Sequence, residues 1–285
     1  MSIVRIAIQK SGRLNQDSIQ LLQNCGIHID NGKDQLKASA TNFPLEILFL
    51  RNGDIPQYVE DGVAELAIIG ENLLVESQNN IEVIRKLGFS KCKLSLAVPK
   101  EAKYEDVRFF EGKKIATSYP NTLNSYLNKQ GINADIHLIK GSVEIAPNIG
   151  LADGICDLVS SGSTLFKNGL KETETILTSE ACLVKSNKLT EAQNKTLDTL
   201  LFRMDAVQKG KKSKYVLMNA PNEKIETIAS ILPGMRSPTV LPLAEKGWSS
   251  VHSVIEEGEF WKVIDQLKEA GAEGLLIIPI EKMVL

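Results

Sequence analysis

The sequence predicts an α/β protein with two βα lobes hinged like a clam, followed by a small ferredoxin-like domain. Three observations predict this fold. Short apolar runs alternate with helical patterns through the first half, and strand-like segments near the middle leave the first lobe and return to it. The last quarter has the order strand, helix, strand, strand, helix, strand. Ligands bind between the lobes of such folds, so a cleft is expected there.

Composition narrows the class of protein. The 285 residues are 43% hydrophobic and 24% charged, which is typical of a globular protein with more than one domain. A formal net charge of −2 argues against a nucleic-acid partner. No apolar stretch approaches the roughly 18 residues that span a membrane. The start of the chain lacks a signal-peptide pattern, and the four cysteines form no CxxC pair, so we expect a cytoplasmic protein without a membrane partner.

The first lobe begins with a strand and a basic turn. Residues 3–8 alternate as a strand, and a helical pattern then runs to Gly26. The turn between them contains Lys10, Gly12 and Arg13. Backbone N–H groups, an ammonium and a guanidinium at a helix start can together bind a polyanion. The alternative is that Lys10 and Arg13 are ordinary solvated charges.

Two buried strands complete the expected first lobe. Residues 45–50 and 66–70 are continuous apolar runs, and polar residues follow each of them directly: Arg51 after the first, Glu71 and Asn72 after the second. In open α/β sheets, ligands bind beyond the carboxyl ends of the strands. These three side chains are therefore expected to line the cleft.

The second lobe repeats the strand–helix pattern. Strands are expected at residues 114–117 and 134–139, and a helix at residues 145–152. Glu144 and Asp153 lie on either side of that helix, where both could reach the mouth of the cleft. Alternatively, Glu144 caps the helix and Asp153 belongs to a solvated turn.

A hydroxyl-rich turn ends this lobe and is its most informative motif. An apolar run that contains Asp157 breaks into five small residues before a short helix: Ser160, Ser161, Gly162, Ser163 and Thr164. Small residues, hydroxyl donors and the exposed N–H groups of a helix start together favour a bound phosphate. Asp157 could hold sugar hydroxyls or face a ligand-borne magnesium ion. The alternative is that Ser161 or Ser163 only caps the helix.

Three segments define the expected domain boundaries. Residues 92–98 alternate as the strand that leaves the first lobe, residues 173–184 return to it, and residues 210–214 form a polar linker. The first lobe is thus expected at residues 1–98 and 178–209, the second at 99–177 and the C-terminal domain at 210–285. A small C-terminal module of this kind more often binds a regulatory ligand or another subunit than performs chemistry.

Six blocks in order resemble one family: IAIQKSGRL, LAIIGEN, KIATSYP, GSVEIAPNIGLADGICDLVSSGSTL, ILPGMRSPTVLPLA and IPIEKM. Together they resemble the long form of ATP phosphoribosyltransferase along the whole chain. The resemblance implies transfer of the phosphoribosyl group of PRPP to N1 of ATP, with release of pyrophosphate and with Mg²⁺ carried by the substrates. It also implies a core like type II periplasmic binding proteins, an ACT-like C-terminal domain that binds histidine as feedback inhibitor, and assembly into dimers and hexamers.

The resemblance also implies roles for individual residues. The 5-phosphate of PRPP would lie in residues 160–164, with Asp153 and Asp157 on its ribose hydroxyls. Lys10, Arg13 and Asp157 would be catalytic. The nucleotide and its phosphates would meet Lys10, Gly12, Arg13, Arg51, Glu71, Ser95, Thr117, Ser118, Tyr119 and Glu144. Histidine would contact Asn219, Ser237, Thr239 and Ala272.

Two alternatives to this enzyme are open at the level of sequence. A clam-like protein could bind a small phosphorylated solute without catalysis. Such a protein would explain the lobes and the cleft, but it leaves unexplained two opposed phosphate-type turns and an appended βαββαβ domain. A catalytically silent regulatory relative is disfavoured, because the acidic and basic positions are all present.

Overall fold

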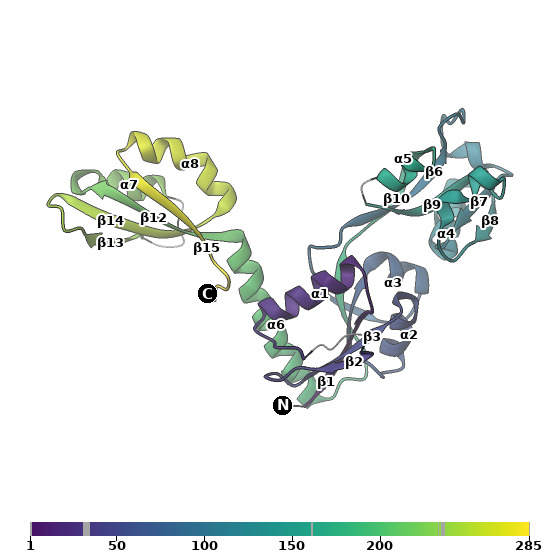
Figure 1. Ribbon diagram of the computed structural model, residues 1–285, viewed down its shortest axis with the longest axis horizontal. Coiled ribbons are helices and arrows are strands. Elements are labelled where there is room, and N and C mark those ends of the chain that lie inside the picture. Colours follow the sequence, from purple (N-terminus) through teal and green to yellow (C-terminus); the bar gives the residue numbers. More distant parts are fainter. Residues whose placement is uncertain (1, 31–34, 161, 233, 235–236, 285) are drawn as a thin grey trace. The chain divides into compact units, whose positions relative to one another are not determined.

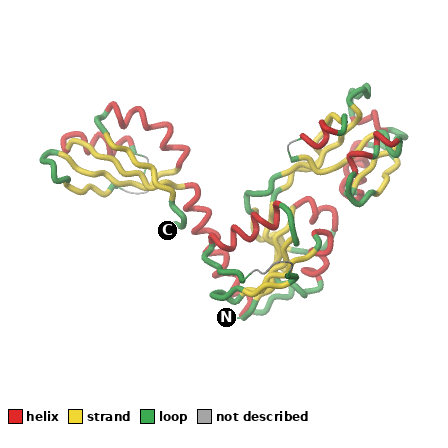
Figure 2. Tube along the Cα trace, viewed as in Figure 1, coloured by secondary structure: helices red, strands yellow, loops and turns green. Residues whose placement is uncertain are grey.

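The computed structural model describes residues 2–30, 35–160, 162–232, 234 and 237–284. The chain forms two compact units, one made of Met1–Gln20 and Ile27–Thr196, the other of Leu21–Gly26 and Leu197–Leu285. Figure 1 labels their elements, and Figure 2 shows the strands grouped into separate sheets with helices beside them.

The first lobe is built on a six-stranded sheet in the order β2-β3-β1-β4-β11-β5. Its strands are β1 (Val4–Gln9), β2 (Lys37–Ser39), β3 (Leu45–Leu50), β4 (Leu66–Gly70), β5 (Glu82–Lys86) and β11 (Ala181–Lys185). Its helices are α1 (Arg13–Asn24), α2 (Ile55–Glu60) and α3 (Glu71–Ser77), with a 3₁₀ turn at Asn52–Asp54. Strand β1 pairs in parallel with both β3 and β4, so the carboxyl ends of all three strands open at one edge.

The second lobe has a five-stranded sheet in the order β10-β6-β9-β7-β8. Its strands are β6 (Cys92–Pro99), β7 (Lys114–Thr117), β8 (Asp135–Leu138), β9 (Gly154–Val159) and β10 (Leu170–Ser179). Helices α4 (Pro120–Gln130) and α5 (Ser163–Lys167) accompany it, with 3₁₀ turns at Val107–Phe110, Val143–Ile145 and Pro147–Ile149. Phe110, Leu96 and Ile115 are fully buried in its core.

Two chain segments connect the lobes. Residues 87–91, which we call the hinge segment, lead from β5 to β6, and Glu180 alone separates β10 from β11. The expected boundary at residue 98 is therefore wrong, since β6 pairs with β9 and β10 in the second sheet. Its buried side chains belong to the second core, which the alternating pattern of residues 92–98 could not indicate.

Two further local expectations are wrong. The helix expected at residues 145–152 is replaced by two 3₁₀ turns, because Pro147 cannot continue a hydrogen-bonded helix and Gly150 has a φ of +73°. The polar linker expected at residues 210–214 is regular structure: α6 (Glu191–Lys212) runs directly into β12 (Ser213–Pro221). Lysines in the last turn of a helix are favoured by its dipole, so the basic run extends α6 instead of breaking it.

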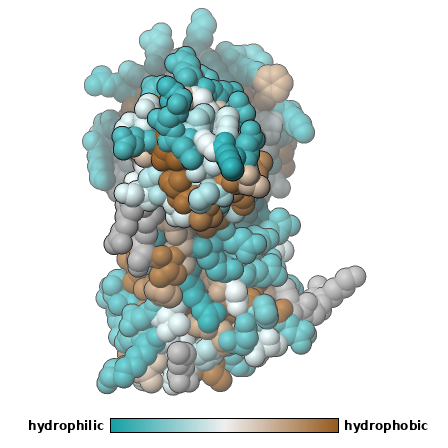
Figure 3. Space-filling model, turned by 90° about the vertical axis from the view of Figure 1, so that its left-hand side faces the viewer, coloured by the Kyte–Doolittle hydropathy of each residue, from teal (hydrophilic) through white to brown (hydrophobic). Residues whose placement is uncertain are grey.

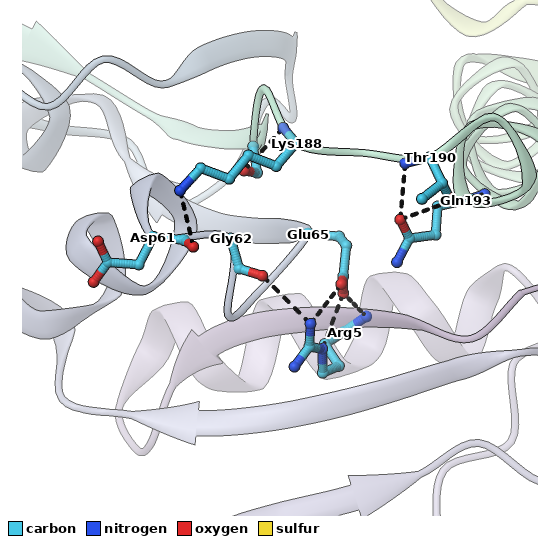
Figure 4. A network of polar contacts seen from close by, with 8 residues as sticks. Arg5, Asp61, Gly62, Glu65, Lys188, Thr190 and Gln193 are labelled. Carbon is cyan, nitrogen blue, oxygen red and sulfur yellow. Dashed lines mark hydrogen bonds and ion pairs between the residues drawn. The ribbon is translucent and has the colours of Figure 1, made fainter.

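An ion pair ties β1 to the turn that precedes β4 (Figure 4). Glu65 accepts a hydrogen bond from the Arg5 backbone at 2.7 Å and from its guanidinium Nη2 at 2.6 Å, and its side chain is 7% exposed. Burial alone would raise the pKa of Glu65, but the hydrogen bonds from Arg5 outweigh it and leave the pKa below its ordinary value. The pair stabilises the first lobe, away from the carboxyl edge of the sheet.

The C-terminal unit carries the expected ferredoxin-like domain. Its elements after β12 are a 3₁₀ turn at Asn222–Lys224, α7 (Ile225–Ile231), β13 (Thr239–Pro242), β14 (Trp248–Glu256), α8 (Glu257–Glu269) and β15 (Glu273–Pro279). The sheet order is β13-β14-β12-β15, and every neighbouring pair is antiparallel. Val216, Met218 and Phe260 form its buried core. This arrangement confirms the prediction of a βαββαβ domain.

Several apolar side chains of this domain lie at the surface. Leu241 on β13 is 51% exposed, and Leu276 and Ile278 on β15 are 54% and 44% exposed. Figure 3, which looks onto this unit, shows hydrophobic side chains gathered among hydrophilic ones. Among the described residues, no helix is both long enough and apolar enough to cross a bilayer.

Candidate active site

A cleft between the two lobes contains two adjoining cavities. The smaller one has a volume of about 210 Å³ and is lined by Gln9, Arg13, Leu14, Asn52, Gly70, Asn72, Ser90, Lys91, Cys92, Leu158 and Ser160. The larger has a volume of about 430 Å³ and is lined by Glu71, Lys86, Lys91, Cys92, Lys93, Val159, Ser160, Thr178, Ser179 and Glu180. Several lining residues lie at or just after the carboxyl ends of β1, β3, β4 and β9, where ligands bind in open α/β sheets. The others come mainly from the hinge segment, the start of β6 and the end of β10.

The basic turn after β1 presents Arg13 to the smaller cavity. The Lys10 backbone N–H donates to the Leu50 carbonyl at 2.7 Å, and Gly12 has a φ of +91° that favours glycine. Arg13 keeps 73% of its side chain exposed, and its Nε lies 3.8 Å from the Asp17 carboxylate. The guanidinium is therefore available to an anion. Lys10 does not line either cavity.

The hydroxyl-rich turn contributes Ser160 to both cavities. Helix α5 begins at Ser163, and Gly162 holds the position before it with a φ of +70°. Because glycine has no side chain, the first turn receives no side-chain cap from that position, and Ser163 is not the capping residue. Ser163 and Thr164 are exposed at the helix start, whereas Ser161 lies outside the described residues. The structure thus brings Arg13 and Ser160 to one cleft, as the sequence predicts.

Asp157 lies on β9, three residues before Ser160, but it does not line either cavity. The two residues that follow it on β9 do line the cleft, Leu158 the smaller cavity and Val159 the larger one. Burial raises the pKa of Asp157, and the nearby Glu144 carboxylate adds to the rise, although the Leu158 backbone N–H donates to Asp157 at 2.8 Å and opposes it. Asp157 and Glu144 therefore form a carboxylate pair beside the turn.

Asp153 does not join this pair. It precedes β9 and accepts a hydrogen bond from the Lys114 backbone at 2.9 Å, at the edge of the sheet where β7 and β9 begin. Residues 160–164 lie beyond the other end of β9, about 20 Å away along a six-residue strand. The prediction that Asp153 acts beside Asp157 is therefore wrong for this structure.

Two predicted nucleotide contacts are fully buried in the second sheet. Ser95 is 0% exposed and its hydroxyl lies 3.3 Å from that of Thr175. Thr117 is also 0% exposed and accepts a hydrogen bond from the Tyr119 backbone at 2.9 Å. These hydroxyls support the sheet and are not exposed to a ligand.

The remaining predicted nucleotide contacts differ in position. Glu71 lines the larger cavity and pairs with Lys86 at 3.0 Å. The Ser118 hydroxyl donates to the Ile139 carbonyl at 2.5 Å, which ties together the segments that follow β7 and β8. Gly12 and Arg51 do not line either cavity. For Arg51, the reason is that the chain turns after β3 and presents the next residue, Asn52, to the smaller cavity.

A set of hydrogen bonds that we call the interlobe seam joins α3 to the start of α4. Glu76 accepts from the backbone N–H groups of Asn121 and Thr122 at 3.0 and 2.9 Å, and from the Thr122 hydroxyl at 2.8 Å. The Asn72 amide donates to the Tyr119 hydroxyl at 3.2 Å. Burial, with the Asp157 charge as a second cause, raises the pKa of Tyr119 to about 12. A carboxylate of one lobe thus caps a helix of the other.

Asn52 and Lys91 are among the cleft residues that sequence reasoning missed. Asn52 lines the smaller cavity, and its Oδ1 is buried without a partner among the described residues. Its position directly after β3 could have indicated it. Lys91 lines both cavities from the hinge segment. No motif surrounds it, so only the topology brings it to the site.

The four residues predicted to contact histidine do not gather at one place. Asn219 on β12 pairs with Glu273, next to Ala272, which is 4% exposed. Thr239 lies on β13, which β14 separates from β12, so it is about 10 Å from β12 across two strand spacings. Ser237 is exposed just before β13. Within this unit, these four residues therefore do not form one compact pocket.

Among the described residues, no group of three or more His, Cys, Asp or Glu side chains is placed to hold a metal ion.

Two lobes with separate sheets, joined by two chain segments and holding a cleft at the carboxyl ends of strands, define the class of periplasmic-binding-protein-like folds. A substrate-binding protein of an amino acid ABC transporter shares this fold, with a TM-score of 0.50 and 10% identity over 73% of this chain and 94% of that chain. A solved ATP phosphoribosyl transferase (HisG:HisZ) complex from Thermotoga maritima is more similar. Its TM-score is 0.61 and its identity is 26%, covering 71% of this chain and 98% of that chain.

Sequence comparison then identifies the family. The family model described as ATP phosphoribosyltransferase matches residues 51–206, and the one described as HisG, C-terminal domain matches residues 210–282. The chain is 55% identical over 283 residues to the ATP phosphoribosyltransferase of Cytophaga hutchinsonii, covering 99% of both chains. It is 54% identical to that of Phocaeicola vulgatus, covering 99% of this chain and all of the relative. The chain belongs to the ATP phosphoribosyltransferase family.

This membership confirms the resemblance that the six blocks carry, and with it the prediction of a transferase. The alternative of a binding protein without catalysis is not favoured, because relatives that match along the whole chain are transferases.

Proposed function

We propose that the protein transfers the phosphoribosyl group of PRPP to N1 of ATP and releases pyrophosphate, the first step of histidine biosynthesis. The observation that carries this proposal is the meeting of Arg13 and Ser160 in one cleft of a family member. A basic turn on one lobe and a hydroxyl turn on the other suit a substrate with phosphates at both ends, which PRPP is.

The residues suggest how the reaction is assisted. Attack of adenine N1 on the anomeric carbon breaks the bond to pyrophosphate, through a state with oxocarbenium character. Arg13 would stabilise the charge that collects on the leaving pyrophosphate, which is electrostatic catalysis by a positioned cation. Residues 160–164 would hold the 5-phosphate. Neutral adenine N1 already has a lone pair, so the attack demands no strong general base.

Magnesium is proposed to arrive with the phosphates of PRPP and ATP, where it would neutralise the departing charge. On the protein side, the Asp157 and Glu144 carboxylates beside the turn offer oxygen ligands of the kind magnesium prefers. Asp157 would also accept hydrogen bonds from the ribose hydroxyls. Because its pKa is raised, this role should weaken at a higher pH than for an exposed aspartate as the solution is acidified.

An absorbance assay tests the function. The protein is incubated with ATP, PRPP and Mg²⁺, with pyrophosphatase present to pull the equilibrium towards product, and the ultraviolet absorbance is followed. A rise that requires all three components supports the transfer reaction. No rise, combined with PRPP binding by calorimetry, would instead indicate a catalytically silent relative.

Regulation and assembly belong to the same proposal. The C-terminal domain would bind histidine as a feedback inhibitor, and copies of the chain would associate into dimers and hexamers in the cytoplasm. The exposed apolar side chains on β13 and β15 offer a surface that a second copy could cover. Histidine added to the absorbance assay should slow the reaction. Light scattering after gel filtration should give a mass above the 31.3 kDa of one chain, and a mass equal to one chain would refute the assembly.

A further inference from the structure

The hinge segment carries a cation that no charged group of the described chain neutralises. Lys91 is exposed and lines both cavities, and it has neither a hydrogen bond nor an ion pair with any described residue. The other lysines of the cleft are paired. Lys86 lies 3.0 Å from Glu71, and Lys93 lies 2.6 Å from Glu172. Lys91 is thus the lysine of the described cleft that is left for a ligand.

The position of Lys91 is held on both sides. Before it, the Gly88 backbone N–H donates to the Glu180 carboxylate at 2.9 Å, which ties the two connecting segments together. Next to it, Ser90 has a φ of +49°, which non-glycine residues rarely adopt, and its hydroxyl donates to Asp17 at 2.7 Å. This strained turn is held against α1 by that hydrogen bond. A strained residue held in place at a cleft is a feature of functional sites.

The smaller cavity has the charge that a polyanion requires. Its two charged lining residues are Arg13 and Lys91, and no carboxylate lines it. The larger cavity adds two paired lysines and two carboxylates, and it shares Lys91, Cys92 and Ser160 with the smaller one. A chain of phosphates that extends from one cavity into the other would therefore pass Lys91.

We infer that Lys91 is a further substrate-binding residue, which contacts the polyphosphate chain of a substrate where the two cavities meet, and that Ser90 positions it. This inference rests on the proposed function and adds a residue and a ligand group to it. Two substrates carry such a chain, the pyrophosphate of PRPP and the triphosphate of ATP. Arg13, at the start of α1, and Lys91, in the hinge segment, would both contact the same polyanion.

The test compares the variants Lys91→Gln and Lys91→Arg in the full chain. Loss of a charge-assisted contact should raise the KM of one polyphosphate substrate about tenfold in Lys91→Gln, while Lys91→Arg should retain most of the affinity. The difference should shrink at high ionic strength. A KM that rises for PRPP alone assigns the contact to its pyrophosphate, and one that rises for ATP alone assigns it to the triphosphate.

Two further variants make the test specific. Lys129→Gln removes an exposed lysine on α4 that does not line the cleft, and it should leave both KM values unchanged. Ser90→Gly accepts the positive φ but loses the bond to Asp17, so it should raise the same KM by less than Lys91→Gln does and leave kcat unchanged. Circular dichroism confirms that each variant is folded.

Calorimetry separates this inference from the proposed function. Inorganic pyrophosphate and tripolyphosphate are titrated into the wild type and into Lys91→Gln, and weaker binding by the variant supports the inference even if no product forms. An active Lys91→Gln variant with unchanged KM values and unchanged pyrophosphate affinity would overturn the role of Lys91 while leaving the transfer reaction intact. Equal losses in Lys129→Gln would overturn it as well, because they would show a non-specific charge effect.

Discussion

The interlobe seam and the cleft occupy the same gap between the lobes, yet their polar groups are used in opposite ways. In the seam, the Glu76 carboxylate accepts three hydrogen bonds from the start of α4. In the cleft, Arg13 keeps a largely exposed guanidinium, and Lys91 has no partner among the described residues. The hydrogen-bonded carboxylate of Glu76 fixes the lobes, whereas exposed cations at a concave surface are available for a ligand.

The largest expected effect concerns Arg13. The variant Arg13→Ala should lower kcat/KM about 100-fold, because it removes the cation of α1 that is proposed to stabilise the leaving group. Lys10→Ala, in the same turn but outside the cavity lining, should reduce turnover less. Steady-state kinetics with both substrates measures the losses. Arg108→Ala, which changes an exposed arginine outside the cleft, is the matched control and should resemble the wild type. Equal losses in all three variants would refute the distinction.

A second effect tests a paired group that has no role in binding. Glu65→Gln should destabilise the first lobe by about 2 kcal/mol. It weakens an ion pair in which the buried Glu65 carboxylate accepts hydrogen bonds from the backbone and the guanidinium of Arg5. The pKa of Glu65 is lowered in the folded protein, so its stabilising contribution is present above the unfolded value of about 4.3 and is lost as the pH falls through the folded value. Thermal unfolding should therefore separate wild type and variant at pH 7 and bring them together in acid, once the pH has fallen below the lowered pKa of folded Glu65. A difference that grows in acid would contradict the assignment.

A smaller effect is expected in the interlobe seam. Glu76→Gln keeps the size of the side chain but removes its charge from the start of α4, which should cost about 1 kcal/mol locally. The backbone amides of Asn121 and Thr122 should then exchange with deuterium about fivefold faster. Glu101→Gln serves as control, because Glu101 is an exposed residue of the second lobe without a hydrogen bond or ion pair to any described residue. Unchanged exchange at α4 would show that the seam does not hold the lobes.

The smallest effect concerns Asp157. Asp157→Asn should raise the KM for PRPP a few-fold, because the asparagine oxygen still accepts a hydrogen bond and only the charge is lost. In the wild type, the raised pKa means that protonation begins at a higher pH than for an exposed aspartate, so PRPP affinity should fall as the pH is lowered. The variant has no such group and should give a flatter profile. A parallel profile in both proteins would exclude Asp157 from the site.

Much of the fold could be predicted because buried strands have clear patterns. The runs at residues 45–50, 66–70 and 114–117 coincide with β3, β4 and β7. Strand β5 was not predicted, since its residues are largely exposed at a sheet edge and show no apolar alternation. The assignment of β6 to a lobe also required the pairing, because an alternating strand carries no information about which sheet it joins.

The site was predictable to the extent that its residues follow strands. Arg13 and Ser160 come after β1 and β9, and the structure brings them together. Asp153 was placed wrongly because the six-residue strand β9 separates it from Ser160. A linear motif does not show at which end of a strand each of its residues lies. Lys91 was not predicted, because its position depends on the hinge segment, which connects β5 of the first sheet to β6 of the second.

The most direct test of the contrast between seam and cleft is deuterium exchange of the wild type with and without PRPP and Mg²⁺. Bound PRPP should protect the amides of the hinge region, residues 88–93, and of the residues that follow β9, 160–167. It should leave the amides of Asn121 and Thr122 in the seam unchanged. Protection confined to the seam or to the C-terminal unit, with none at residues 160–167, would contradict the account.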